Sequence, residues 1–186
     1  MKVLLFNGST RKNGCTYTAL SEIAKVLNEA DIETEILQMG GNSIRDCIGC
    51  GGCEGKGHCV FNDDMVNEWI DKAKDADGFI FGTPVYFAHP SGQIQSLMDR
   101  MFYAGGEYFA HKPGAVITSA RRGGTTASLD TLSKYFGISQ MPMITSTYWN
   151  MVYGQMPGDV KNDEEGMANM KNLGENMAYL LKKIKE

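Results

Sequence analysis

The sequence predicts a three-layer α/β fold, in which helices cover both faces of a five-stranded parallel sheet in a doubly wound arrangement. Short apolar runs alternate along the chain with segments in which apolar residues recur every three or four positions. The middle runs are apolar throughout, which is typical of strands that are buried on both faces of a parallel sheet. Strands that alternate with helices form βαβ units, and such units build a parallel sheet.

Five segments are predicted to be strands. The first, Val3–Phe6, is followed after a polar loop by a helical pattern, and Phe79–Phe81 is short and fully apolar. The predicted strands are residues 3–6, 34–37, 79–81, 115–117 and 141–147.

Five helices are predicted between and after the strands. In the first, Leu20, Ile23, Ala24 and Leu27 follow the i, i+3, i+4, i+7 spacing of one buried helix face. Asp63 and Asp64 precede the second and can cap it. The later stripes are Val66, Trp69, Ile70 and Ala73; Ile94, Leu97, Met98 and Met101; and Met170, Leu173, Met177, Leu180, Leu181 and Ile184. A further helix is predicted over residues 125–136.

Length and composition favour one globular domain over residues 1–186, with a cysteine-rich insertion at residues 44–62. The chain has 186 residues, 42% of them hydrophobic and 22% charged, which is ordinary for a globular protein. The net charge of −4 argues against a nucleic-acid partner. No apolar run reaches the roughly 18 residues of a membrane span, and the first residues show no signal-peptide pattern. We therefore expect no membrane partner and a cytoplasmic location.

Four cysteines stand within thirteen residues in the pattern C-x2-C-x2-C-x5-C: Cys47, Cys50, Cys53 and Cys59. Three of them, spaced by three residues in a glycine-rich segment, can face inward together, and the fourth can close the set. This suits a [4Fe–4S] cluster, in which each iron takes one thiolate. Zinc fits less well, because zinc sites usually pair two C-x2-C units that lie farther apart. Free thiols and a disulfide or redox switch are the remaining alternatives.

Loop one, residues 7–16, joins the first predicted strand to the first helix, and ligands of doubly wound folds bind at such strand ends. Its glycines allow close approach of a ligand, its hydroxyls and arginine can bind an anion, and the helix start offers free N–H groups. It matches neither G-x-G-x-x-G nor a Walker loop, so we expect a terminal phosphate rather than a pyrophosphate. The candidate ligands are Ser9, Thr10, Arg11, Asn13, Gly14, Cys15 and Thr16.

Loops two and three follow the third and fourth predicted strands. Loop two, residues 82–90, offers two aromatic side chains that can flank a planar ring. Loop three, residues 118–126, offers arginines beside glycines. A phosphate pocket beside a ring-sized slot is best matched by FMN. The candidate residues are Pro84, Val85, Tyr86 and Phe87 in loop two, and Ser119, Arg121, Gly123 and Gly124 in loop three.

In these motifs the sequence resembles the NAD(P)H-dependent FMN reductase and flavodoxin-like superfamily and, within it, the iron–sulfur flavoproteins. Loop one matches the phosphate motif G-S-x-R-x-x-x-x-T, with Thr10 where proline is usual. T-P-V-Y-F at residues 83–87 matches the loop that holds the isoalloxazine ring, and Arg121 with its two glycines matches the third flavin loop. The Asp99–Arg100 pair also fits. The cysteine run, followed by D-D-M at residues 63–65, matches the compact cluster motif.

The resemblance covers nearly the whole chain and implies a flavodoxin-like fold and a function. FMN would take hydride from NADH or NADPH and pass electrons through a [4Fe–4S] cluster to a small-molecule or protein acceptor. The flavin itself would carry the chemistry, so no catalytic side chain is expected. The family is typically oligomeric, which implies a homodimer or homotetramer.

Two other functions compete with this one. A cluster-free NAD(P)H:FMN, quinone, nitro or azo reductase would keep the four cysteines as free thiols and would lack iron. A sensor or binding module would hold flavin or metal without turnover and would not be reduced rapidly by NADH or NADPH.

Overall fold

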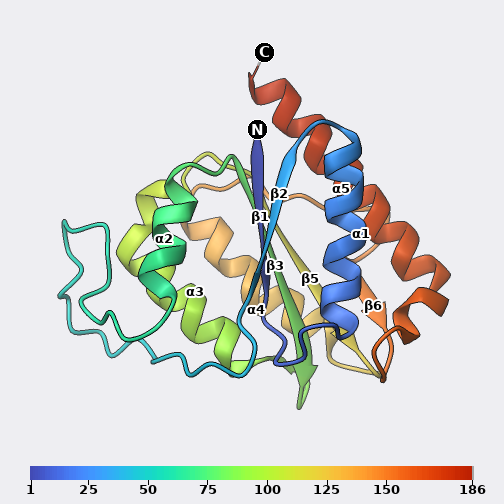
Figure 1. Ribbon diagram of the computed structural model, residues 1–186, viewed down its shortest axis with the longest axis horizontal. Coiled ribbons are helices and arrows are strands. Elements are labelled where there is room, and N and C mark those ends of the chain that lie inside the picture. Colours follow the sequence, from blue (N-terminus) through green and yellow to red (C-terminus); the bar gives the residue numbers. More distant parts are fainter. Residues whose placement is uncertain (186) are drawn as a thin grey trace.

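The computed structural model describes residues 1–185, whose sheet is covered by helices on both faces (Figure 1). Its strands are β1 Lys2–Asn7, β2 Glu33–Gln38, β3 Gly78–Tyr86, β4 His89–Pro90, β5 Gly114–Ala120 and β6 Met151–Tyr153. Its α-helices are α1 Cys15–Glu29, α2 Val66–Lys74, α3 Gly92–Gly105, α4 Thr125–Ile138 and α5 Glu164–Lys185, and two short 3₁₀ helices are η1 Gly106–Tyr108 and η2 Asp159–Asn162.

The sheet confirms the doubly wound, flavodoxin-like prediction. Its parallel strands follow the order β2-β1-β3-β5-β6, and the two-residue β4 pairs antiparallel with the end of β3. Strand order reverses between β1 and β3, so the loops that leave these strands run to opposite faces of the sheet. A crevice forms at such a switch point, outside the carboxyl ends of the strands.

The strands alternate their side chains between two hydrophobic layers, because successive residues of a strand point to opposite faces. Leu4 and Phe6 face α2, α3 and α4, whereas Val3 and Leu5 face α1 and α5. Figure 1 shows these two groups of helices on opposite sides of the sheet. The Phe6 ring stacks on Phe81 of β3, with ring centroids 4.5 Å apart, so the switch-point strands are also joined through the core.

The fifth strand was predicted in the wrong place. Residues 141–147 make only an isolated bridge, Gly114 to Met143, and the strand is β6 at Met151–Tyr153. The reason lies in Asn150, whose side-chain amide donates to the carbonyl oxygens of Val116 and Ile144 at 3.1 and 3.3 Å. These bonds replace strand pairing there, and the intervening residues leave the sheet until β6 pairs with β5.

The cysteine-rich segment has no helix or strand between residues 39 and 65. It runs from the end of β2 along the outside of the α2–α3 layer and returns to the start of α2 (Figure 1). The N-cap of α2 is Met65 rather than either predicted aspartate. Asp64 accepts a hydrogen bond from the backbone N–H of Val66 at 3.1 Å, whereas Asp63 pairs with Arg45 at 2.7 Å. Within residues 1–185, no helix is both long and apolar enough to cross a bilayer.

Two helical glycines give a matched test of the packing between α1 and α5. A Cβ at Gly174 would lie 2.9 Å from the Val26 Cβ and 3.3 Å from the Ile23 carbonyl oxygen, whereas a Cβ at Gly137 would meet nothing within 4 Å. We expect Gly174→Ala to lower the free energy of unfolding by about 1 kcal/mol, because overpacking outweighs the gain in helix propensity. Gly137→Ala should raise it by about 0.5–1 kcal/mol. Urea denaturation measures both, and equal stabilisation by the two would contradict close α1–α5 packing.

Candidate functional site

Loop one is held against the end of β3 by a close backbone contact. The N–H of Gly8 donates to the carbonyl oxygen of Gly82 at 2.8 Å. A Cβ at Gly8 would lie 2.8 Å from the same oxygen, so only glycine allows this approach. Ser91, which caps α3, donates to the carbonyl oxygen of Gly8 at 3.1 Å. Loop one, β3 and α3 therefore meet at the switch point.

The backbone of loop one is ordered by short polar links. The side-chain oxygen of Asn7 accepts from the N–H of Ser9 at 3.2 Å, and the Ser9 hydroxyl accepts from the N–H of Arg11 at 3.1 Å. Gln38 of β2 bonds both the Asn7 side chain and the Ser9 carbonyl. Among residues 1–185, no side chain caps the start of α1, and its first turn holds no acidic residue. Its N–H groups thus remain directed at the loop, as an anion site requires.

A cavity of about 220 Å³ opens where loops one, two and three meet, and we call it the switch-point cavity. The hydroxyls of Thr16 and Ser119 meet across it at 2.7 Å. The Arg11 guanidinium donates to the carbonyl oxygen of Gln155 at 3.3 Å. The lining residues are Ser9, Arg11, Cys15, Thr16, Pro84, Val85, Tyr86, Ser119, Ala120, Arg121, Gly154 and Gln155.

Nine residues predicted as cofactor ligands line this cavity: Ser9, Arg11, Cys15, Thr16, Pro84, Val85, Tyr86, Ser119 and Arg121. Six do not: Thr10, Asn13, Gly14, Phe87, Gly123 and Gly124. Three lining residues were not predicted as ligands: Ala120, and Gly154 and Gln155, which follow β6 and were hidden by the misplacement of that strand. The M-V-Y-G-Q run at residues 151–155, an apolar triplet before glycine, was the available signal.

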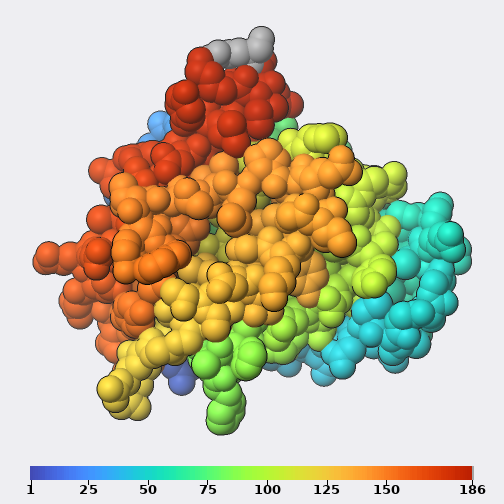
Figure 2. All heavy atoms as spheres, turned by 180° about the vertical axis from the view of Figure 1, so that it is seen from behind, coloured from blue at the N-terminus to red at the C-terminus, as the bar shows by residue number. Residues whose placement is uncertain are grey.

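Loops two and three touch each other beside the cavity. Phe87 and Ala88 turn the chain from β3 into β4 with left-handed φ values of 50° and 62°, and the Phe87 side chain is fully exposed. Gly124 lies against this turn with φ 99°, where a Cβ would come 2.5 Å from the Ala88 Cα. The two loops form the green and yellow projections at the lower edge of Figure 2. Phe87 therefore extends away from the cavity that its neighbour Tyr86 lines.

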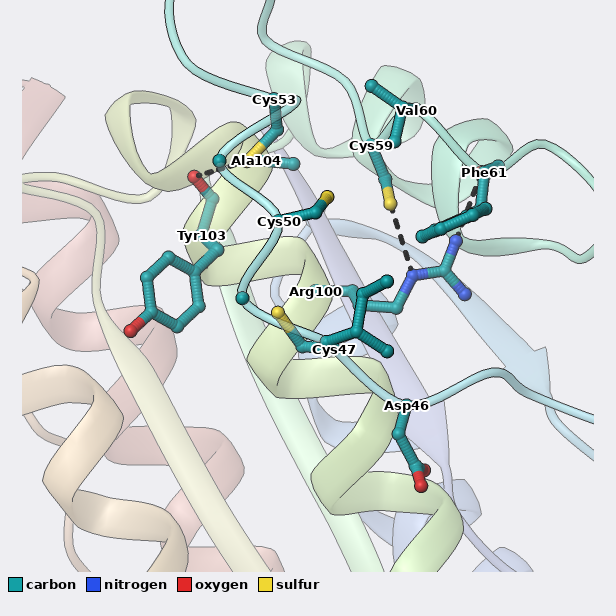
Figure 3. A pocket seen from close by; sticks show the side chains of 13 residues that line it. Asp46, Cys47, Cys50, Cys53, Cys59, Val60, Phe61, Arg100, Tyr103 and Ala104 are labelled. Atoms are coloured by element: carbon teal, nitrogen blue, oxygen red, sulfur yellow. Dashed lines mark hydrogen bonds between the residues drawn. The ribbon is translucent and has the colours of Figure 1, made fainter.

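A second cavity, of about 180 Å³, lies under the cysteine-rich segment, and we call it the cysteine cavity. All four cysteines of the C-x2-C-x2-C-x5-C run line it, together with residues from the second half of α3. Figure 3 shows the four sulfurs spread around the space, with Cys59 directed at Arg100. Cys53 turns its sulfur toward the carbonyl oxygen of Tyr103, at 3.8 Å. The segment curls because Gly49 and Gly51, on either side of Cys50, both have left-handed φ.

The donor set of the cysteine cavity matches an iron–sulfur centre better than a single metal ion. A single zinc would draw its four sulfurs to about 2.3 Å from one point. The four sulfurs of the cysteine cavity line a space several times the roughly 30 Å³ of one water molecule. A centre of several irons and sulfides occupies such a space while each cysteine stays at its edge.

Arg100 of α3 forms the floor of the cysteine cavity (Figure 3). Its Nε donates to the sulfur of Cys59 at 3.3 Å, and its guanidinium pairs with Asp64. Burial alone would lower the pKa of Arg100, but the Asp64 carboxylate and the Cys59 sulfur outweigh burial and raise it. The arginine is therefore charged at any physiological pH. In the sequence, only the family resemblance pointed to Arg100, because its hydrogen-bond partners lie 36 to 55 residues away along the chain.

Comparison with known proteins decides the family. The sequence model of the family described as NADPH-dependent FMN reductase matches residues 1–155. The chain belongs to this family. An iron–sulfur flavoprotein of Methanocaldococcus jannaschii is 36% identical, and the alignment covers 100% of both chains. An iron–sulfur flavoprotein of Archaeoglobus fulgidus is 30% identical over 96% of both chains. Within the FMN reductase family, the chain thus groups with the iron–sulfur flavoproteins, and it is an FMN-dependent oxidoreductase.

Solved structures share the fold of this FMN reductase family member. A flavone reductase superimposes with a TM-score of 0.75 at 19% identity and covers 100% of this chain and 65% of its own. A flavodoxin from the domain Archaea superimposes with a TM-score of 0.66 at 15% identity, over 98% of this chain and 99% of its own. At such identities the likeness concerns the fold alone.

Adjacent glycines of loop three test the contact beside the switch-point cavity. We expect Gly124→Ala to lower the free energy of unfolding by about 1–3 kcal/mol, because its backbone is left-handed and the new Cβ meets the Ala88 backbone. Gly123→Ala should change it by less than about 0.5 kcal/mol, since a Cβ there meets nothing within 4 Å. Thermal or urea unfolding measures the difference. Equal effects of the two substitutions would show that loops two and three do not depend on each other.

Proposed function

We propose that this FMN reductase family member takes reducing equivalents from NADH or NADPH and passes electrons, through a [4Fe–4S] cluster, to an acceptor. The observation that carries the proposal is the presence of two cavities in one chain. One has the anion-binding loop and planar slot that suit FMN, and the other is lined by four cysteine sulfurs. α3 joins them: its cap Ser91 touches loop one, and its Arg100 touches Cys59.

Loop one would bind the phosphate of FMN. Arg11 supplies a cation and hydroxyls come from Ser9 and Thr16, while the uncapped N–H groups at the start of α1 point in the same direction. These groups suit a terminal dianion, because charge-assisted hydrogen bonds and a helix N-terminus both favour negative charge.

Loops two and three would hold the flavin ring. Pro84, Val85 and Tyr86 offer one wall of the cavity, and Ser119 and Arg121 offer polar groups at the other. FMN, when bound, supplies hydride chemistry and can release electrons singly, so the protein need provide no nucleophile. The chain's own residues would bind and orient the ring.

Cys47, Cys50, Cys53 and Cys59 would each bind one iron of the cluster. Two kinds of support exist: the shape of the cysteine cavity and the names of the relatives, which are iron–sulfur flavoproteins. All five cysteines of the chain are free thiols. This fits a reducing compartment such as the cytoplasm, which we propose as the location. A small molecule or a protein would accept the electrons.

A homodimer or homotetramer is the proposed assembly. Large apolar side chains are exposed on the segment before β6 and on loop two, namely Tyr148, Trp149 and Phe87. Exposed aromatic side chains of this size are typical of surfaces that bind another subunit.

A cluster-free reductase is the second candidate. The observation in its favour is that all five cysteines are free thiols, which a reductase without iron would also have. In that case an open flavin face would reduce quinone, nitro or azo compounds, and the cysteines would be free thiols. A flavin-binding sensor without turnover is excluded if NADH or NADPH reduces the bound flavin rapidly.

Two threonines on α1 test the phosphate site. Thr16→Val removes a cavity hydroxyl at nearly constant shape, and we expect FMN to bind about tenfold more weakly, since a hydrogen bond to a charged group is worth about 1.5 kcal/mol. Thr18→Val is the matched control, because its hydroxyl bonds the Gly14 carbonyl oxygen and lies outside the cavity. Fluorescence quenching of FMN measures the dissociation constant. Equal affinities of the two variants would contradict this phosphate site.

Cofactor analysis under exclusion of oxygen tests the whole proposal. We expect about four irons, four sulfides and one FMN per chain, and reduction of the flavin by NADH or NADPH in stopped flow, with the faster nucleotide identified as the donor. Cys50→Ser should lose iron, whereas Cys15→Ser, outside the run, should keep it. FMN without iron supports the cluster-free reductase, and neither cofactor after reconstitution would falsify both candidates.

A further inference from the structure

We propose that Arg100 is a positioning residue for the cluster, which fixes Cys59 as a ligand and, through its N–H···S hydrogen bond, makes the reduction potential more positive. This inference rests on the proposed function, since it concerns the cluster that the cysteine cavity would hold. It assigns a role to a side chain that touches a sulfur ligand rather than the irons.

Arg100 is the largest fully buried side chain of the described residues. Four hydrogen bonds use most of the five N–H groups of its guanidinium. Nε donates to the Cys59 sulfur at 3.3 Å, and one terminal nitrogen donates to the Phe61 carbonyl oxygen at 3.0 Å (Figure 3). The other terminal nitrogen donates to the Arg45 carbonyl oxygen at 3.3 Å and to the Asp64 carboxylate.

These partners lie at both ends of the cysteine-rich segment. Arg45 precedes the first cysteine, and Phe61 and Asp64 follow the last. One side chain of α3 therefore joins the two ends of a segment that has no helix or strand of its own. Closing such a loop costs conformational entropy, and a rigid, planar donor on a helix fixes its ends in one arrangement.

The charge of Arg100 is balanced on the side away from the cavity. The Asp64 side chain is 3% exposed, and its carboxylate also accepts hydrogen bonds from the backbone N–H groups of Arg45 and Val66 at 3.2 and 3.1 Å. A buried ion pair adds little net stability over an apolar pair of similar volume. Its effect here is orientation: Asp64 holds one edge of the guanidinium, so that Nε is directed at Cys59.

A hydrogen-bond donor at the Cys59 sulfur changes the free energy of adding an electron to the cluster. Reduction of a [4Fe–4S] cluster adds one electron, and the extra negative charge spreads onto the ligand sulfurs. A cationic N–H donor beside one sulfur stabilises that charge, and hydrogen bonds to the sulfurs are known determinants of cluster potentials. Arg100 should therefore favour the reduced form, and no proton or further reactant is needed.

The test compares two identical substitutions, Arg100→Lys and Arg45→Lys. Both keep the positive charge, but only the first removes a guanidinium that bonds a cysteine sulfur, since the Arg45 side chain pairs with Asp63 at the surface. In mediator titrations of the holoprotein, we expect about a tenfold lower ratio of reduced to oxidised cluster at a fixed potential for Arg100→Lys. This equals a shift of about 59 mV to more negative values for one electron. Arg45→Lys should leave the potential unchanged.

The sign of the shift separates this role from a structural one. A loosened segment would admit water, and water around the sulfurs stabilises the added charge, so the potential would become more positive. An unchanged or more positive potential in Arg100→Lys overturns the proposal while leaving the proposed function intact. Wild-type protein that binds FMN but no iron after anaerobic reconstitution contradicts the proposed function, and the tuning role with it.

A measurement on the unaltered protein covers the case in which Arg100→Lys does not fold or load iron. Protein labelled with ¹⁵N-arginine is reduced, and pulsed electron paramagnetic resonance records couplings between the cluster spin and nearby nitrogen. We expect a ¹⁵N coupling in wild type that Arg45→Lys retains. Its absence from wild type would mean that no arginine nitrogen bonds a ligand sulfur, which overturns the proposal.

Discussion

The close backbone contact between Gly8 and Gly82 is the constraint on which the rest of the structure depends. It joins the chain just after β1 to β3, where the strand order reverses, and brings loop one within 2.8 Å of the β3 backbone. The stacked rings of Phe6 and Phe81 lie behind this contact in the core. A Cβ at Gly8 would lie 2.8 Å from the Gly82 carbonyl oxygen and 3.0 Å from the Ile94 Cβ, so β3 and α3 both require glycine here.

The two cavities are organised by different physical means. At the switch-point cavity, the backbone dominates: loop one is fixed by links among Asn7, Ser9 and Gln38, and the anion-binding groups include main-chain N–H groups. At the cysteine cavity, side chains dominate, because the segment around it has no ladder of backbone hydrogen bonds. Arg100 of α3 and Asn67 of α2 supply contacts that regular structure provides elsewhere.

α3 sets the relation between the two cavities. Its cap Ser91 bonds loop one, and Arg100 lies nine residues farther along, or about 14 Å at 1.5 Å per residue. A helix is stiff over this length, so the flavin and cluster positions that we propose are held at a fixed spacing within one chain. Such a spacing is what a relay of electrons between two centres requires.

The sequence by itself determined the features that short-range chemistry encodes. Apolar periodicity located the first four strands and the five α-helices, but not the short 3₁₀ helices η1 and η2, since the buried face of a longer element repeats within a few residues. Loop one and the C-x2-C-x2-C-x5-C run could be recognised because their candidate ligand residues are neighbours in the sequence. The likeness to iron–sulfur flavoproteins came from these same residues. Nine predicted ligands line one cavity because they lie in the last residues of parallel strands or just beyond their carboxyl ends.

Tertiary structure alone decided the rest, because the deciding partners are distant in the chain. Asn150 replaces strand pairing through the carbonyl of Val116, which displaces the last strand and brings Gln155 to the cavity. Phe87 is turned outward by a left-handed turn packed on Gly124. The local sequence around Arg100 shows only a polar residue on an amphipathic helix. Its contacts with Cys59 and Asp64 form only in the folded chain. No local sequence pattern indicates such contacts, because they form only when distant parts of the chain come together in the fold.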